Sequence, residues 1–346
     1  MDISAIANQA LERAGGATAS GPNAAETLAH LADGEMKAVN ALILERMGSP
    51  VPLIPKLANY LVEAGGKRVR PLVTIAAANM IGYTGDAHLK LAAAVEFIHT
   101  ATLLHDDVVD ESDLRRGRKA ANLVWGNAPS VLVGDFLFAR AFMLMVDAGS
   151  MEALRSLSRA SSIIAEGEVH QLAVKGDIDA TVGSYMEIIE AKTAALFASA
   201  AEVSAIVAGR PAEEIAALDT YGRELGLAFQ LVDDALDYGG LAQTLGKNTG
   251  DDFREGKVTL PVVLALKQGD QADKPFWARV MAEGEQTEAD FETALELLRR
   301  HDALKATLSM AGEKARTAQQ ALAIFPDNEW KTALTDLAEF VVQRAS

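Results

Sequence analysis

Residues 97–110 read FIHTATLLHDDVVD, an apolar helical run that ends in three aspartates spaced as DDxxD. Residues 229–237, FQLVDDALD, end in the same way. Residues i and i+4 share a helix face, so each motif presents two carboxylates to one side. A solvated acidic helix end is the plainer alternative, but the helix dipole favours acids at the opposite end of a helix. Carboxylates concentrated beside an apolar face suit a hard cation, so we expect Mg²⁺ at both motifs.

Helical periodicity continues on both sides of these motifs. Apolar residues recur at helical spacing at Leu91, Val95 and Ile98, and again at Leu225, Ala228 and Val232. No segment alternates as a strand would. We therefore expect an all-α fold, with a flexible N-terminal arm over residues 1–23 and a single domain over residues 24–346.

The composition limits the possible partners. The 346 residues include 32 Lys and Arg against 48 Asp and Glu, which gives a formal charge of −16, and no cysteine. Nucleic-acid binding is disfavoured because it needs a basic face. Without cysteine, no disulfide or thiolate chemistry is available, which fits a cytoplasmic protein. The N-terminus does not resemble a secretory signal, and the apolar runs are expected to be too short to cross a membrane.

Local clusters of cations accompany the acidic motifs. Mg²⁺ binds few protein carboxylates and completes its shell with water and substrate phosphate oxygens, so two such motifs imply a diphosphate between them. Arg115 and Arg116 follow the first motif, while Lys247 and Lys257 flank a glycine-rich stretch after the second. A further basic turn, GGKRVRP, occupies residues 65–71 and by itself is typical of a protein surface.

These motifs together resemble those of the trans-isoprenyl diphosphate synthases, the polyprenyl synthetase family. The resemblance covers residue 36 to the C-terminus and includes residues 65–71, 103–118, 229–237 and 245–261 and the pair Lys192-Thr193. It implies the isoprenoid synthase fold, in which helices surround a deep central cavity. It also implies a prenyltransferase that joins isopentenyl diphosphate to an allylic diphosphate after Mg²⁺-assisted ionisation.

The resemblance assigns roles to individual residues. Three Mg²⁺ ions are expected on the acids of the two motifs, namely Asp106, Asp107, Asp110, Asp233, Asp234 and Asp237. The allylic diphosphate site is expected to comprise Arg115, Lys192, Thr193, Gln230, Lys247 and Lys257. Isopentenyl diphosphate is expected to bind through Lys67, Arg70, His99 and Arg116. Catalysis is assigned to Asp106, Asp107, Asp110, Asp233 and Asp234 together with Lys192 and Lys247. A histidine on an apolar helix is more often a core residue, but its position favours His99 as a ligand, whereas His105 is expected to pack against or orient the acids.

Product length in this family depends on a hydrophobic tunnel below the first motif. Short-chain members block the tunnel with aromatic residues four or five positions before the first aspartate, where this chain has Thr102 and Ala101. We therefore expect an open tunnel and an octaprenyl to decaprenyl product of the kind used for quinone side chains. Phe97 and Phe142 are candidates for the tunnel floor, although ordinary core packing is the commoner role for such residues.

The resemblance also implies a homodimer, and the apolar product implies transient membrane contact for release. Four alternatives stay open: a shorter-chain farnesyl or geranylgeranyl diphosphate synthase, a non-catalytic subunit of a heteromeric synthase, a terpene cyclase and a simple divalent-cation-binding protein. The retained acids in both motifs argue against the subunit, and residues 65–71 with Arg116 argue against the cyclase.

Overall fold

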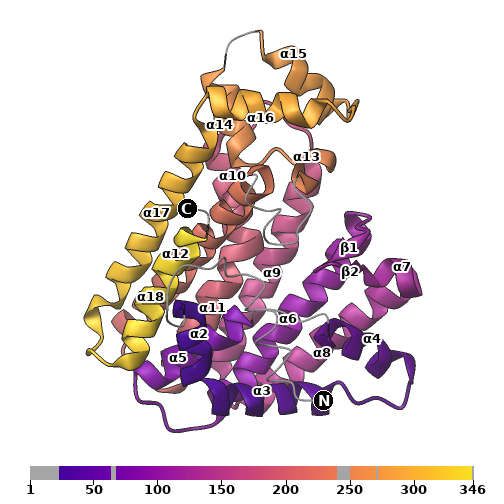
Figure 1. The fold of residues 1–346 in the computed structure, drawn as a ribbon. Helices are drawn as coiled ribbons and strands as arrows, with labels where there is room; N and C mark the ends of the chain where they lie inside the picture. Colours follow the sequence, from indigo (N-terminus) through magenta and orange to yellow (C-terminus); the bar gives the residue numbers. More distant parts are fainter. Residues whose placement is uncertain (1–22, 64–67, 240–249, 270–271, 345–346) are drawn as a thin grey trace.

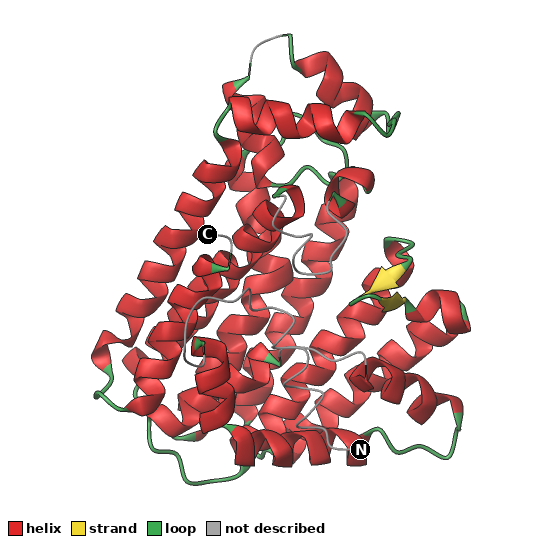
Figure 2. Cartoon of the chain, viewed as in Figure 1, coloured by secondary structure: helices red, strands yellow, loops and turns green. Residues whose placement is uncertain are grey.

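The chain folds into a bundle of helices (Figure 1). The structure is a computed structural model, and it describes residues 23–63, 68–239, 250–269 and 272–344. Figure 2 shows that helices make up almost all of the described chain. The expected all-α fold is confirmed. Lys67, Lys247 and the expected N-terminal arm, apart from Asn23, lie outside the described residues.

The elements of the first half lead from the N-terminal helices to the long α9. They are α2 (Ala24–Leu31), α3 (Asp33–Arg46), α4 (Leu53–Glu63), α5 (Val69–Met80), α6 (Ala87–Val109), β1 (Leu114–Arg115), β2 (Arg118–Lys119), α7 (Ala121–Trp125), α8 (Asn127–Asp147) and α9 (Met151–Ala173).

The described part of the second half includes the 27-residue helix α12 and the π-helical turns η1 and η3. Its elements are α10 (Val182–Ile189), η1 (Glu190–Ala194), α11 (Ala195–Val207), α12 (Ala212–Tyr238), α13 (Asp251–Arg254), α14 (Leu260–Gln268), α15 (Lys274–Trp277), η3 (Ala278–Ala282), α16 (Asp290–Arg300), α17 (Ala303–Ala321), the 3₁₀ turn η4 (Leu322–Ile324) and α18 (Glu329–Gln343).

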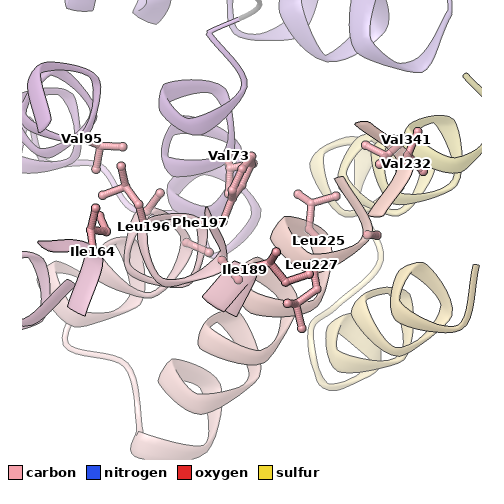
Figure 3. Packing of buried hydrophobic residues seen from close by; sticks show 14 of the residues in the cluster. Val73, Val95, Ile164, Ile189, Leu196, Phe197, Leu225, Leu227, Val232 and Val341 are labelled. Atoms are coloured by element: carbon pink, nitrogen blue, oxygen red, sulfur yellow. The ribbon is translucent and has the colours of Figure 1, made fainter. Parts of the chain in front are cut away.

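Helix α11 lies at the centre of the bundle. It is apolar on nearly all sides and contacts α5, α6, α9 and α12, as a fully buried helix should. Two glycines of α12 allow the close approach of α11 and of the end of η1, because a Cβ at Gly222 would lie 2.2 Å from the Phe197 carbonyl oxygen and one at Gly226 would lie 2.7 Å from the Ala194 Cα. Figure 3 shows Leu196 and Phe197 of α11 within this core.

A minimal hairpin follows α6, where the sequence pattern predicts no strand. Arg115 pairs with Arg118 across a two-residue turn of Arg116 and Gly117. Both turn residues have positive φ, 54° and 74°, as a type I′ turn requires. The hairpin keeps Arg115 and Arg116 beside the end of α6.

Helix α8 corrects one expectation from the sequence. Among the described residues it alone is long and apolar enough to cross a membrane by length and composition, with a mean hydropathy of 1.6 over its most apolar window. Core helices have the same composition, and α8 packs along α6, with Gly134 directly beneath His105. Only 39% of that window is buried in the single chain, so part of the helix presents apolar side chains outward.

Candidate active site

The first acidic motif forms the last turn of α6, and its middle acid is buried. Asp107 is 1% exposed, and its Oδ1 accepts hydrogen bonds from Arg115 Nε at 2.8 Å and Nη2 at 2.5 Å. Its backbone carbonyl accepts a hydrogen bond from the Asn122 side chain at 3.0 Å. The Oδ2 atom is buried without a hydrogen-bond partner among the described residues. Asp107, which was predicted to bind a metal ion, is thus paired with Arg115, which was predicted to bind a diphosphate.

The second motif forms the last turns of α12, and two of its acids are held by hydrogen bonds. Asp234, 3% exposed, accepts hydrogen bonds from Gln230 Nε2 at 2.7 Å and from the Tyr185 hydroxyl. Asp237 accepts from the backbone amides of Asp251 at 3.2 Å and Asp252 at 3.0 Å, which begin α13. Burial is the largest cause that raises the pKa of Asp234, to about 7. In the structure, Asp237 therefore caps α13 as well as belonging to the motif.

Two lysines connect separate parts of the chain to the first motif. Lys257 Nζ lies 2.9 Å from Asp110 Oδ2 and 2.5 Å from Glu255 Oε2. Lys192 Nζ, from η1, lies 2.7 Å from Glu168 Oε2 and 3.9 Å from Asp106 Oδ2. The structure thus gathers two of the predicted diphosphate-binding lysines at the end of α6.

The acids fit a cation that is completed by a substrate. Among residues 23–63, 68–239, 250–269 and 272–344, no three His, Asp or Glu side chains converge closely enough to hold a metal ion by themselves. Burial raises the pKa of Asp106 to about 6, with the charges of Glu168 and Asp110 acting in the same direction and that of Lys192 opposing them. A buried, mutually repelling set of carboxylates with an unpartnered oxygen at Asp107 has the donor chemistry of a Mg²⁺ site that also needs phosphate oxygens.

The described residues predicted for isopentenyl diphosphate, Arg70, His99 and Arg116, lie close together between α5, α6 and the hairpin. Arg70 Nη1 lies 3.3 Å from His99 Nε2, and its guanidinium stacks 4.3 Å from the centre of the Phe197 ring. Burial lowers the pKa of Arg70 to about 10. Burial, with the nearby charges of Arg70 and Arg116, holds the pKa of His99 well below its usual value, so the imidazole is neutral. Excess positive charge among partly buried groups favours an anion here.

A small pocket borders both predicted sites. Its lining combines cations, carboxylates and apolar side chains from α4, α6 and the hairpin, namely Leu61, Arg68, Glu96, Thr100, Leu103, Asp107, Arg115 and Arg116. Arg68 and Glu96 form an ion pair at 2.5 Å. A second small pocket is also lined by Arg68, Glu96 and Thr100 and extends to Phe97.

The chain-length residues lie in different surroundings. Ala101 is fully buried, and the Thr102 hydroxyl donates to the His99 carbonyl oxygen at 2.8 Å. Phe97 is buried at 2% exposed. Phe142 is 41% exposed on the outer face of α8, which does not fit the tunnel floor expected from the sequence. Apolar residues occur on both faces of α8, so the sequence could not show whether Phe142 faces the core or the surface.

His105 packs toward α8, whereas the sequence predicts that it packs against or orients the acids of the first motif. Its Nε2 lies 3.2 Å from the Val131 carbonyl oxygen and 3.4 Å from Asp135 Oδ1, and its ring stacks on Phe138.

Several residues at the site were given no role in the sequence analysis. Gln171 contacts Lys192 at 2.9 Å, and the Arg344 guanidinium lies 4.7 Å from the centre of the Phe229 ring and feels the charge of Asp233. Asp252 is half-buried near Asp234 and Asp237, and its desolvation, followed by the charges of these two carboxylates, raises its pKa well above its usual value. These contacts join segments far apart in the chain, so only the folded structure reveals them.

Comparison with known proteins identifies the family. Residues 51–298 match the family model of polyprenyl synthetase. Octaprenyl diphosphate synthase of Escherichia coli (strain K12) is 48% identical over 319 residues, which cover 92% of this chain and 98% of that protein.

Two solved structures are similar along nearly the whole chain. A polyprenyl synthase from Caulobacter crescentus CB15, complexed with calcium and isoprenyl diphosphate, has a TM-score of 0.90 at 56% identity and covers 95% of this chain and 100% of that chain. A decaprenyl diphosphate synthase from Rhodobacter capsulatus has a TM-score of 0.90 at 52% identity, and the match covers 93% of this chain and 99% of that chain. The chain therefore belongs to the polyprenyl synthetase family, has the all-α isoprenoid synthase fold and is a prenyltransferase.

Proposed function

We propose that the chain is a long-chain all-trans polyprenyl diphosphate synthase that makes an octaprenyl to decaprenyl product for quinone side chains. The observation that carries this proposal is the contact of Lys192 and Lys257, from separate parts of the chain, with Asp106 and Asp110 at the end of α6. The small, buried Ala101 lies on the same helix. The similar octaprenyl and decaprenyl synthases support the same product class.

The carboxylates at the ends of α6 and α12 would hold three Mg²⁺ ions, and they are Asp106, Asp107, Asp110, Asp233, Asp234 and Asp237. When bound, Mg²⁺ stabilises the negative charge of a departing diphosphate. Lys192 and Lys257 lie against carboxylates in the described structure, at 2.7 Å from Glu168 and 2.9 Å from Asp110. Both lysines can turn toward diphosphate oxygens, because their hydrogen bonds in the structure are to side chains and not to backbone atoms.

The reaction uses charge and exclusion of water, without a side-chain nucleophile. Lys192, Lys257 and Arg115 stabilise the diphosphate as the allylic C–O bond breaks and leaves a delocalised carbocation. The buried surroundings keep water from the cation. The double bond of isopentenyl diphosphate then forms the new C–C bond, and a proton passes to the released diphosphate.

Arg70 would fix the diphosphate of the second substrate, isopentenyl diphosphate, with neutral His99 and Arg116 beside it. We expect Arg70→Ala to raise the KM for isopentenyl diphosphate about tenfold, because a charge-assisted hydrogen bond is lost. The KM for the allylic substrate should change much less. Steady-state kinetics with each substrate varied in turn measure both values, and thermal unfolding reports the lost Phe197 contact. A larger change for the allylic substrate would contradict the assignment.

A homodimer would cover the outer face of α8. This face exposes large apolar side chains, with Leu132 at 67%, Phe142 at 41%, Met143 at 47% and Val146 at 63%. Exposed apolar area of this kind on one helix favours a protein partner. We further propose a cytoplasmic enzyme that touches the membrane only to release its product, with residues 1–23 as an arm beside a single domain.

A direct assay tests whether the chain is catalytic by itself. The purified chain is incubated with labelled isopentenyl diphosphate and farnesyl diphosphate, with Mg²⁺ or with excess EDTA. Transfer of label into an extractable prenyl product should occur with Mg²⁺ and stop with EDTA. Absence of transfer by the pure chain, with transfer restored by a second protein, would favour the non-catalytic subunit.

A further inference from the structure

Four side chains from α10, η1 and α12 form one hydrogen-bonded series that ends at the second acidic motif. The Thr193 hydroxyl donates to Gln230 Oε1 at 2.8 Å. Gln230 Nε2 donates to Asp234 Oδ1 at 2.7 Å, and the Tyr185 hydroxyl donates to Asp234 Oδ2. Each carboxylate oxygen of Asp234 therefore has one fixed donor.

The two outer members of the series come from one continuous helical segment. Tyr185 lies in α10, and Thr193 lies in η1, which follows α10 directly. A π-helical turn widens the helix and often occurs at functional sites. The segment thus contacts α12 at two points, one on either side of the Asp234 carboxylate.

These contacts restrict the orientation of the Asp234 carboxylate, because the side chains that make them are buried. Tyr185 is 5% exposed, Thr193 6% and Asp234 3%. Asp233 and Asp237 repel the Asp234 carboxylate, so its orientation depends on the donors that hold it. Each carboxylate oxygen can accept a second interaction besides the one it has, which leaves room for a cation or its water ligands.

We propose that Tyr185 is a positioning residue for Mg²⁺ binding at the second acidic motif: its hydroxyl fixes the Asp234 carboxylate in the orientation that the motif needs. Tyr185 donates its only hydroxyl hydrogen to Asp234 and is not itself part of either acidic motif. The inference rests on the proposed function, because that function places Mg²⁺ and diphosphate at this motif.

The test compares the full-length wild-type chain with Tyr185→Phe, which removes only the hydroxyl oxygen. Two measurements are made: the Mg²⁺ concentration that gives half-maximal prenyl transfer, and Mn²⁺ binding by electron paramagnetic resonance with inorganic diphosphate present. Because a hydrogen bond to a charged group is lost, both midpoints should rise about tenfold in Tyr185→Phe. The kcat at saturating Mg²⁺ should stay within about twofold, since the ligands themselves remain.

Tyr221→Phe is the matched control. Tyr221 lies on α12 and is fully buried, and its hydroxyl donates to the Leu334 carbonyl oxygen at 2.8 Å. This variant should lower thermal stability about as much as Tyr185→Phe but leave both metal midpoints unchanged. Thr193→Val removes the hydrogen bond to Gln230 at the other end of the series. It should shift the metal midpoints in the same direction as Tyr185→Phe.

Two results would overturn the proposal: unchanged metal midpoints in Tyr185→Phe, or equal shifts in Tyr185→Phe and Tyr221→Phe. A failure of the proposed function would give a different experimental result from a failure of this proposal. The wild-type chain would then transfer no prenyl group, while the Mn²⁺ titration would still decide the role of Tyr185.

Discussion

Replacing Asp106 by alanine is expected to lower the rate of prenyl transfer at least about a hundredfold, because the departing diphosphate loses part of its electrostatic stabilisation. Asp106 lies on the last turn of α6, where burial raises its pKa to about 6 and Lys192 lies 3.9 Å away. Asp233→Ala should have an effect of the same size, because the second motif is proposed to hold the other side of the diphosphate.

Folding should change little in these variants. Removing one of several repelling carboxylates relieves charge repulsion, so thermal unfolding of Asp106→Ala should stay close to that of the wild type. Asp179→Ala, at an exposed position, serves as the control and should retain wild-type turnover. Initial rates at saturating substrates and Mg²⁺ provide the comparison. Near-normal turnover in Asp106→Ala would contradict metal binding by the first motif.

Ala101→Phe is expected to shorten the product from octaprenyl or longer to farnesyl or geranylgeranyl diphosphate. Ala101 is fully buried on α6, five positions before Asp106, so a phenyl ring there would occupy space that a growing chain needs. The effect should be graded with volume, with Ala101→Val giving a smaller shortening than Ala101→Phe.

Chromatography of the dephosphorylated products measures this shortening. The rate of the first condensation is the internal control, because the diphosphate sites are unchanged and should still support it. Wild-type product length in Ala101→Phe, with the variant folded and active, would show that the tunnel runs elsewhere.

The sequence predicted the parts of the fold that depend on local pattern. Helical periodicity predicted the all-α bundle, and the two DDxxD motifs predicted acids at the ends of α6 and α12. The hairpin at Arg115–Arg118 was not predicted, because it depends on two positive φ angles at its turn and not on alternation of apolar residues.

The sequence was less informative about which atoms meet. It grouped Asp237 with the metal ligands, whereas the fold also uses both of its oxygens to cap α13. It did not indicate Tyr185, because no spacing rule relates α10 to Asp234, 49 residues later. It placed Phe142 near the tunnel floor, since an apolar residue on a two-sided apolar helix gives no sign of which face it occupies. Long-range contacts of this kind require the folded chain.

The measurement that most directly tests the central claim is the chain length of the wild-type product. The enzyme is incubated with labelled isopentenyl diphosphate, Mg²⁺ and farnesyl diphosphate, and the dephosphorylated products are sized by chromatography. We predict a ladder that ends at octaprenyl to decaprenyl. A product series that stops at geranylgeranyl would be consistent with the reaction but would contradict the long-chain assignment and an open tunnel below Ala101.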